Sequence, residues 1–186
     1  MAEYGTRGHR PPGWQREHLQ RYLATDGEDG HIWEGLPTLL LTTTGRRTGK
    51  PHTTPLIYSQ DGDRYIVVGS RGGAPEPPQW YRNLLAEPRV QVQVRADRFP
   101  ARARPATAAE KPAFWQRMAQ IYPPYDEYQA RTTREIPVVI IERLVTRAPG
   151  AGARPGRPLD AKTGGQRRTR CQTATYTPVK PRMGSI

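Results

Sequence analysis

Residues 42–58 read Thr-Thr-Thr-Gly-Arg-Arg-Thr-Gly-Lys-Pro-His-Thr-Thr-Pro-Leu-Ile-Tyr and enclose a short polar loop between two strand-like runs. An apolar run, Leu39–Leu41, precedes the stretch, and the residues from Thr53 onward are again rich in strand formers. Gly45 and Gly49 bound the loop itself. Two strand patterns joined by a short loop with glycines predict a β-hairpin. The fold class follows from the similar runs farther along the chain.

The loop carries three cations and a hydroxyl, supplied by Arg46, Arg47, Thr48 and Lys50. Arginine offers a planar fork of donors that suits phosphate or carboxylate, and glycines let backbone N–H groups approach a ligand. The loop is therefore an anion site or, alternatively, a solvated basic turn. It is not a nucleotide P-loop, because that motif has four residues between its glycines and a Ser or Thr where Pro51 follows the lysine here.

Charge is unevenly distributed along the 186 residues, which carry a net charge of +12 and are 35% apolar. Residues 147–186 contribute +8, and the preceding 146 residues contribute only +4. We therefore expect three parts: residues 1–35 with a short helix, a folded domain over 36–146, and a basic tail over 147–186. The tail is rich in Gly, Pro and Arg and is expected to be disordered. An arm that binds nucleic acid or an anionic membrane is the alternative.

Cys171 is the single cysteine, so neither a disulfide framework nor a four-cysteine zinc site is possible within one chain. The four histidines show no metal-ligand spacing, and we predict no metal site. No stretch resembles a signal peptide or reaches the ~20 apolar residues of a membrane span. These features lead us to expect a cytoplasmic protein.

Hydrophobic periodicity predicts six strands, mostly antiparallel, which cover residues 36–44, 52–59, 64–70, 89–95, 98–105 and 137–142. Helices are expected at 14–25 and 79–86, and the capping box Thr107–Glu110 predicts that a third begins there. The polar, aromatic segment 125–134 suggests a further short helix. The fold class is then mainly β with α (α+β): a six-stranded closed or split β-barrel with two to three short helices. A barrel buries these strands without long exposed edges.

Three further groups could carry chemistry, and each has a plainer interpretation. The turn Gly69-Ser70-Arg71-Gly72-Gly73 could bring a flat ligand close to the backbone or be an ordinary glycine loop. Trp80 and Asn83 share a helix face and could close a site, or Trp80 could belong to the core. Tyr122, Tyr125 and Tyr128 could wall a pocket for an aromatic substrate or form a surface aromatic patch.

The chain lacks an obvious nucleophile, metal or acid–base pair. Val68 occupies the position where a nucleophile elbow around Ser70 would need glycine. If the protein is an enzyme, a bound cofactor is therefore expected to supply the chemistry.

Five ordered motifs resemble the deazaflavin-dependent nitroreductase family, whose actinobacterial members use coenzyme F420: Leu-Leu-Thr-Thr-Thr-Gly-Arg-Arg-Thr-Gly-Lys-Pro (40–51), Gly-Ser-Arg-Gly-Gly-Ala-Pro (69–75), Gln-Trp-Tyr-Arg-Asn-Leu (79–84), Tyr-Pro-Pro-Tyr-Asp-Glu-Tyr-Gln (122–129) and Arg-Glu-Ile-Pro-Val-Val (134–139). The resemblance covers roughly residues 36–142. It implies a split β-barrel of the FMN-binding type. It also implies an oxidoreductase that transfers a hydride from reduced F420 to a quinone-like or nitroaromatic acceptor.

The same resemblance implies a set of site residues. Ser70, Tyr125 and Tyr128 would act on the acceptor side. The cofactor would contact Arg46, Arg47, Thr48, Lys50, His52, Thr54, Val68, Gly69, Ser70, Arg71, Gln79, Trp80, Asn83 and Tyr125. FMN, which lacks the glutamate tail of F420, is a less suitable ligand.

Two departures from the family pattern leave questions open. The family's Pro-Leu-Tyr or Pro-Leu-Leu-Tyr is Pro55-Leu56-Ile57-Tyr58 here, so either Ile57 or Tyr58 could face the pocket. The tail after Arg147 lies outside the pattern, and a peripheral membrane contact is one use for it. A non-enzymatic flavin or deazaflavin carrier, or a nucleic-acid binder acting through the tail, is the alternative function. The sequence does not decide the oligomeric state.

Overall fold

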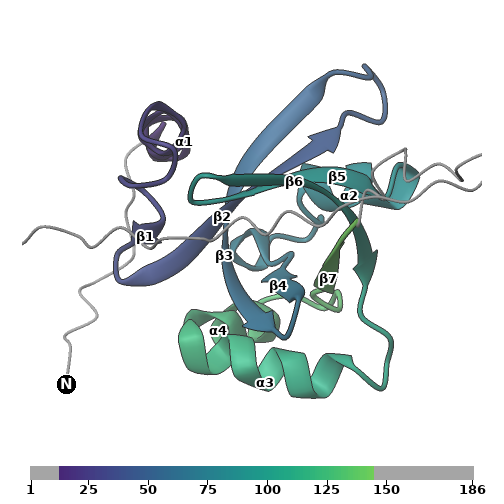
Figure 1. Cartoon of the computed structure of the whole chain (residues 1–186). Coiled ribbons are helices and arrows are strands. Elements are labelled where there is room, and N and C mark those ends of the chain that lie inside the picture. The colour runs from purple at the N-terminus through teal and green to yellow at the C-terminus, as the bar shows by residue number, and fades with distance from the viewer. Residues whose placement is uncertain (1–12, 145–186) are drawn as a thin grey trace, which may run out of the picture. The chain divides into compact units, whose positions relative to one another are not determined.

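The computed structural model describes residues 13–144 (Figure 1). Within that range the chain forms seven strands, four α-helices and one 3-10 turn. The strands are β1 (Ile32–Trp33), β2 (Leu36–Thr44), β3 (Pro51–Asp61), β4 (Arg64–Val68), β5 (Arg89–Val94), β6 (Asp97–Pro105) and β7 (Val138–Arg143). The helices are α1 (Trp14–Ala24), η1 (Arg71–Gly73), α2 (Gln79–Ala86), α3 (Lys111–Ile121) and α4 (Pro124–Ala130).

Strands β2 to β7 close into a barrel in the order β2-β3-β4-β7-β6-β5, and β5 returns to β2 through pairs such as Leu41 with Val92. All pairings among the described strands are antiparallel. The long β2–β3 hairpin extends beyond the rest of the barrel (Figure 1). Closure leaves no free sheet edge in the barrel. The predicted six-stranded split β-barrel is thus confirmed.

Alternate residues of the strands serve two separate cores. One core fills the barrel and includes Leu39, Val67, Val139 and Ile141. The other lies outside the barrel, where α3 and α4 cover the strands; its buried members are Leu36, Ile66, Val68, Phe114, Met118, Tyr122, Tyr125, Ile136, Val138 and Ile140. Strand β7 contributes to both cores, which explains why its sequence is apolar at consecutive positions and confirms its predicted central place.

Helix α3 begins at Lys111, so the prediction that it begins at the capping box was wrong by about one turn. The box itself is present: the Thr107 backbone N–H donates to the Glu110 carboxylate at 2.9 Å, and the Glu110 N–H donates to the Thr107 hydroxyl at 3.3 Å. It closes a turn that precedes the helix. Pro112 has no N–H to donate and is favoured in the first turn of a helix, which places the helix start beside it.

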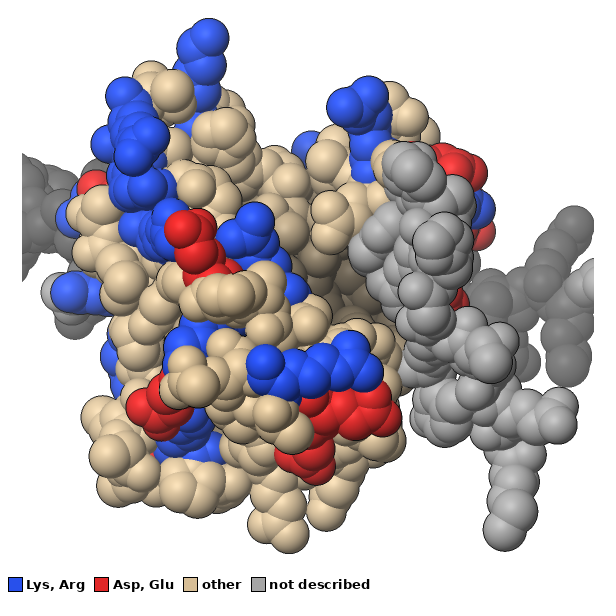
Figure 2. Space-filling model, turned by 180° about the vertical axis from the view of Figure 1, so that it is seen from behind, with Lys and Arg blue, Asp and Glu red and all other residues tan. Residues whose placement is uncertain are grey.

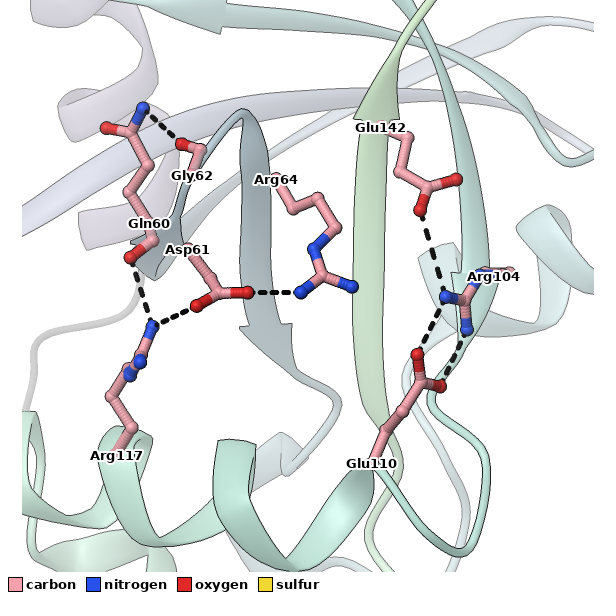
Figure 3. A network of polar contacts seen from close by, with 8 residues as sticks. All are labelled: Gln60, Asp61, Gly62, Arg64, Arg104, Glu110, Arg117 and Glu142. Atoms are coloured by element: carbon pink, nitrogen blue, oxygen red, sulfur yellow. Dashed lines mark hydrogen bonds and ion pairs between the residues drawn. The ribbon is translucent and has the colours of Figure 1, made fainter.

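Two ion-pair groups attach α3 to the barrel (Figure 3). In the first, the Asp61 carboxylate accepts hydrogen bonds from Arg64 and, at 3.0 Å, from Arg117 of α3. Arg117 also donates to the Gln60 carbonyl at 3.2 Å. The bonds from Arg64 and then Arg117 lower the pKa of Asp61 below its ordinary value. The carboxylate therefore stays charged into the acidic range.

In the second group, the guanidinium of Arg104 in β6 donates two hydrogen bonds, of 2.8 and 2.9 Å, to the Glu110 carboxylate (Figure 3). Arg104 also lies 3.7 Å from Glu142 of β7. Hydrogen bonding by Arg104, followed by the backbone of Thr107, lowers the pKa of Glu110 well below its usual range. Bidentate pairing of this kind is more specific in geometry than a single charge contact.

The α1–β1 segment docks on the barrel through a buried polar group. Tyr22 is fully buried; its hydroxyl donates to the Thr38 carbonyl at 3.1 Å and accepts from the Arg95 backbone N–H at 2.8 Å. His31 Nδ1 lies 3.1 Å from the same carbonyl oxygen. Burial, and then the charge of Arg95, lowers the pKa of His31. His31 therefore resists charging at mildly acidic pH.

The sequence missed β1, and the four α-helices of residues 13–144 exceed the two to three that were expected. None of the described helices has the length and apolar character to cross a membrane. The expectations for the first twelve residues and for the tail over 147–186 lie outside the described residues. The proposed division at residues 35 and 146 therefore stays a prediction.

Candidate active site

A cavity of about 740 Å³ opens where α1, β1, β3, the end of β4, α2 and α4 meet. Its lining includes eight of the predicted site residues: Thr54, Val68, Ser70, Arg71, Gln79, Trp80, Tyr125 and Tyr128. Other predicted residues lie outside the lining: Arg46, Arg47, Thr48, Lys50, His52, Gly69 and Asn83. The structure thus gathers the three acceptor-side residues and five of the expected cofactor contacts in one place, and it sets the cationic loop apart from them.

The turn that carries Ser70 begins directly after Val68 at the end of β4. Its backbone is held by bonds from the Gly69 N–H to the Pro137 carbonyl at 2.8 Å and from the Gly73 N–H to the Ser70 carbonyl at 3.0 Å. Gly73 has φ 78°, and a Cβ there would lie 2.7 Å from the Tyr128 carbonyl oxygen. Glycine at 73 is therefore required by the close approach of α4.

The tyrosines of the α3–α4 corner form one cluster. The rings of Tyr122 and Tyr125 lie 5.0 Å apart at 72°, and the Tyr122 and Tyr128 hydroxyls are 3.1 Å apart. Tyr125 is only 4% exposed, so the alternative of a surface aromatic patch does not describe it. Burial, and then the neighbouring Tyr122 and Tyr128, raises the pKa of Tyr125. Its hydroxyl remains protonated at neutral pH and can donate a hydrogen bond.

The cationic loop folds on itself and exposes its charged side chains. The Gly49 N–H donates to the Gly45 carbonyl at 2.7 Å, and the Lys50 N–H donates to the Thr48 hydroxyl at 3.3 Å. A Cβ on Gly45 would lie 2.8 Å from the His52 ring, so this glycine permits the ring to pack there. Arg46, Arg47, Thr48, Lys50 and His52 are all exposed.

Asn83 joins the loop to the cavity. Its side chain is fully buried, and its Oδ1 accepts from the Arg46 backbone N–H at 3.2 Å and from Gln79 Nε2 at 3.1 Å. Its Nδ2 donates to the Thr43 hydroxyl at 3.2 Å. Asn83 was predicted to close the site, but the structure instead places it between the loop and Gln79, which lines the cavity. Trp80, one turn earlier, is in the core and also lines the cavity.

Positive charge extends from the loop toward the cavity. Lys and Arg side chains gather at the upper left of Figure 2, where the ends of the β2–β3 hairpin and α2 lie. Arg71 and Arg82, which both line the cavity, lie 3.7 and 2.9 Å from the Glu76 carboxylate. The place of half-buried Arg82 in the lining was missed because a single arginine on a short helix gives no signal in the sequence.

The N-terminal segment supplies a wall that the sequence did not reveal. His18 of α1 and Trp33 of β1 stack with ring centroids 4.2 Å apart and an interplanar angle of 19°. His18 Nε2 donates to the Gly30 carbonyl at 2.8 Å, which fixes the ring. Gln15, His18, Trp33 and Thr38 all line the cavity. The fold-back of α1 and β1 onto the barrel brings Gln15, His18 and Trp33 there, whereas Thr38 belongs to the barrel strand β2.

The structure also decides which residue of the pair at 57 and 58 faces the cavity. Ile57 lines it, whereas Tyr58 points into the barrel and is 8% exposed. Tyr58 packs there against Tyr65, with ring centroids 5.5 Å apart.

Among residues 13–144, no group of three or more His, Cys, Asp or Glu side chains is placed to hold a metal ion.

Comparison with known proteins adds a family to this geometry. Residues 14–143 match the model of the F420H(2)-dependent quinone reductase family. An F420H(2)-dependent quinone reductase of Mycobacterium tuberculosis is 42% identical over 134 residues, which is 69% of this chain and 89% of the relative.

Two solved structures also resemble the chain. An F420-H2 dependent reductase (FDR-A) is 41% identical and covers 57% of this chain and 94% of its own, with a TM-score of 0.54. A second, described as a domain-swapped dimer, is 39% identical and covers 72% of this chain and all of its own, with a TM-score of 0.56. The family match spans both the barrel and the segments that line the cavity. This chain belongs to the F420H(2)-dependent quinone reductase family.

Proposed function

We infer that this protein is an F420-dependent oxidoreductase that uses F420H2 to reduce quinone-type acceptors. One structural observation supports the inference most strongly. A single buried side chain, that of Asn83, connects the aromatic cavity to the cationic loop. It contacts both Gln79 in the cavity lining and the backbone of Arg46 in the loop.

The residues present fit such a cofactor chemically. A deazaflavin cofactor has a flat ring and an anionic tail, and the site offers an aromatic, partly apolar wall as well as exposed arginines. We propose that Arg46, Arg47, Thr48 and Lys50 hold the phosphate and glutamate tail. Guanidinium groups form strong charge-assisted bonds to such anions. We further propose that Val68, Ser70, Arg71 and Trp80 contact the ring.

When bound, F420H2 supplies a hydride, and the protein must orient the acceptor and handle one proton. The Tyr125 hydroxyl stays protonated because burial raises its pKa. It is therefore better suited to donate a hydrogen bond to an oxygen of the quinone than to act as an acid that gives up its proton. The Tyr128 hydroxyl, bonded to that of Tyr122, and the half-buried Ser70 hydroxyl offer further donors. A quinone that receives one hydride and one proton becomes the hydroquinone, with the proton drawn from solvent or a nearby hydroxyl.

The walls of the cavity also favour a flat acceptor. Tyr125 and Tyr128 form one aromatic wall, and the stacked His18 and Trp33 form another. Holding the acceptor flat against the donor makes the transfer effectively intramolecular. Nitroaromatic compounds share this flat shape, and we propose them as additional acceptors.

The location of the protein is also a proposal. We propose that it works in the cytoplasm, where it would meet membrane quinones through a peripheral contact. The basic side chains over the β2–β3 hairpin and α2 support such a contact, because anionic lipid attracts basic surfaces (Figure 2).

Steady-state turnover of the purified full-length protein with F420H2 and menadione tests the function. The expected result is a return of the absorbance of oxidised F420 that depends on both protein and quinone. Tight F420 binding without turnover on any of several quinones would favour a carrier. FMN is expected to bind poorly, because it lacks the glutamate tail that the loop would hold.

A further inference from the structure

Arg134 lies behind the turn that carries Ser70, in the segment between α4 and β7. Its Nε donates to the Ala74 carbonyl at 2.8 Å. Its Nη2 donates to the carbonyls of Ser70 at 2.6 Å and Gly69 at 3.3 Å. One guanidinium group therefore holds both ends of the turn 69–74 through its backbone. Arg134 is not among the residues that line the cavity, and it contacts the turn through backbone carbonyls.

The backbone of this turn adopts left-handed conformations that its surroundings must stabilise. Arg71 has φ 47° although it is not glycine, and Gly72 and Gly73 follow with φ 63° and 78°. Left-handed backbone at a non-glycine residue persists only when the surroundings hold it. Arg134 is half-buried, and burial, followed by the charge of Arg71, lowers its pKa. Hydrogen bonds that are shielded from water are stronger than those exposed to it.

Arg134 is itself fixed to the helix that carries the tyrosines. Gln129 of α4 donates from Nε2 to the Arg134 carbonyl at 2.9 Å, and its Oε1 accepts from the Ile136 N–H at 2.8 Å. The neighbouring residue, Tyr128, brings its carbonyl against Gly73 of the turn. The turn, Arg134 and α4 thus form one connected unit.

We propose that Arg134 is a positioning residue that holds the Ser70 turn against α4, so that Ser70 and Arg71 face Tyr125 across the cavity. The effect of Arg134 on catalysis rests on the proposed function, whereas its effect on the conformation of the turn does not. A lysine is not equivalent at this position, because a single ammonium group lacks the Nε–Nη2 fork that reaches Ala74 and Ser70 together.

Hydrogen exchange followed by mass spectrometry tests the effect on the turn in the full chain without cofactor. In Arg134→Gln, amides in peptides that cover residues 69–74 should exchange at least tenfold faster, while β5 and β6 keep their protection. Arg102→Gln, an exposed change on β6, is the matched control and should exchange like the wild type. If Arg134→Gln does not fold, Arg134→Lys retains the charge without the fork and permits the same comparison. Unchanged exchange in the turn would overturn the proposal.

A double-mutant cycle tests the consequence for catalysis. Arg134→Gln should lower kcat/KM for menadione about tenfold or more, with most of the loss in kcat. If Arg134 acts through Ser70 and its turn, the two changes are not independent. The fold-loss of kcat/KM in the double variant Arg134→Gln with Ser70→Ala should then be smaller than the product of the two single fold-losses. Fully multiplicative losses would overturn the positioning role. Absence of wild-type turnover would refute the proposed function alone, because the exchange experiment still decides whether Arg134 holds the turn.

Discussion

Replacing Asn83 tests whether the cationic loop is held in place from inside the protein. Its amide makes three hydrogen bonds, to Arg46, Gln79 and Thr43, and the side chain is fully buried. A hydrogen bond contributes about 0.5–1.5 kcal/mol net, and a buried donor left without a partner costs about 1–3 kcal/mol. Asn83→Leu should therefore lower the free energy of unfolding by about 2–4 kcal/mol.

Losing the hydrogen bonds of Asn83 should lower both the thermal stability of the protein and its affinity for F420. At about 4 °C per kcal/mol, the thermal midpoint should fall by about 8–16 °C. F420 affinity, measured by fluorescence quenching well below the midpoint, should fall about tenfold, because the Arg46 backbone is released from its anchor. Leu85→Ala, an exposed change two residues along α2, is the control and should alter neither quantity much. Lower stability with unchanged F420 affinity would refute the reasoning that Asn83 positions the loop.

Three other expectations concern charge and hydroxyl groups. Arg46→Ala with Arg47→Ala should weaken F420 binding about a hundredfold or more, since each charge-assisted bond contributes about 1.5–3 kcal/mol; unchanged affinity would mean a merely solvated loop. Tyr125→Ala should keep near-normal F420 binding but lose quinone reduction, and Tyr125→Phe should keep part of the activity if the wall is mainly steric; wild-type turnover in Tyr125→Ala would exclude this role. The bond from Arg104 lowers the pKa of Glu110 in the folded state, so this pair stabilises the protein above pH ~4.5, the ordinary pKa of glutamate, and the contribution is lost as pH falls toward the folded pKa. Urea denaturation of Glu110→Gln across pH 2–7 should show a shallower loss of stability in acid than the wild type, and equal slopes would contradict this account.

The barrel could be predicted from the sequence because its strands carry local signals. The run from Leu36 to Thr44, the Asp61-Gly62 turn and the alternation from Arg89 onward each identify an element without reference to the rest of the chain. The same holds for α2, which has the predicted bounds Gln79–Ala86. Ser70, Arg71 and Gly72 of the predicted turn line the same cavity as Tyr125 and Tyr128.

The parts that could not be predicted depend on contacts between distant segments. A two-residue strand such as β1 has no periodicity, so neither it nor the wall formed by His18 and Trp33 had a signal. Asn83 lies on the helix face that the sequence indicated, but only the folded loop shows that its amide is used by Arg46. Gly73 could be recognised as a special position, although its cause, the backbone of Tyr128, lies 55 residues away in the chain.

A single-turnover experiment tests whether F420H2 bound to this protein reduces quinones. The full-length protein is loaded with F420H2 under anaerobic conditions and mixed rapidly with menadione, and oxidised F420 and hydroquinone are both quantified. We expect the two products to appear together in a one-to-one ratio, far faster than in a mixture without protein. F420H2 that stays bound and reduced in the presence of menadione and other quinones would contradict it.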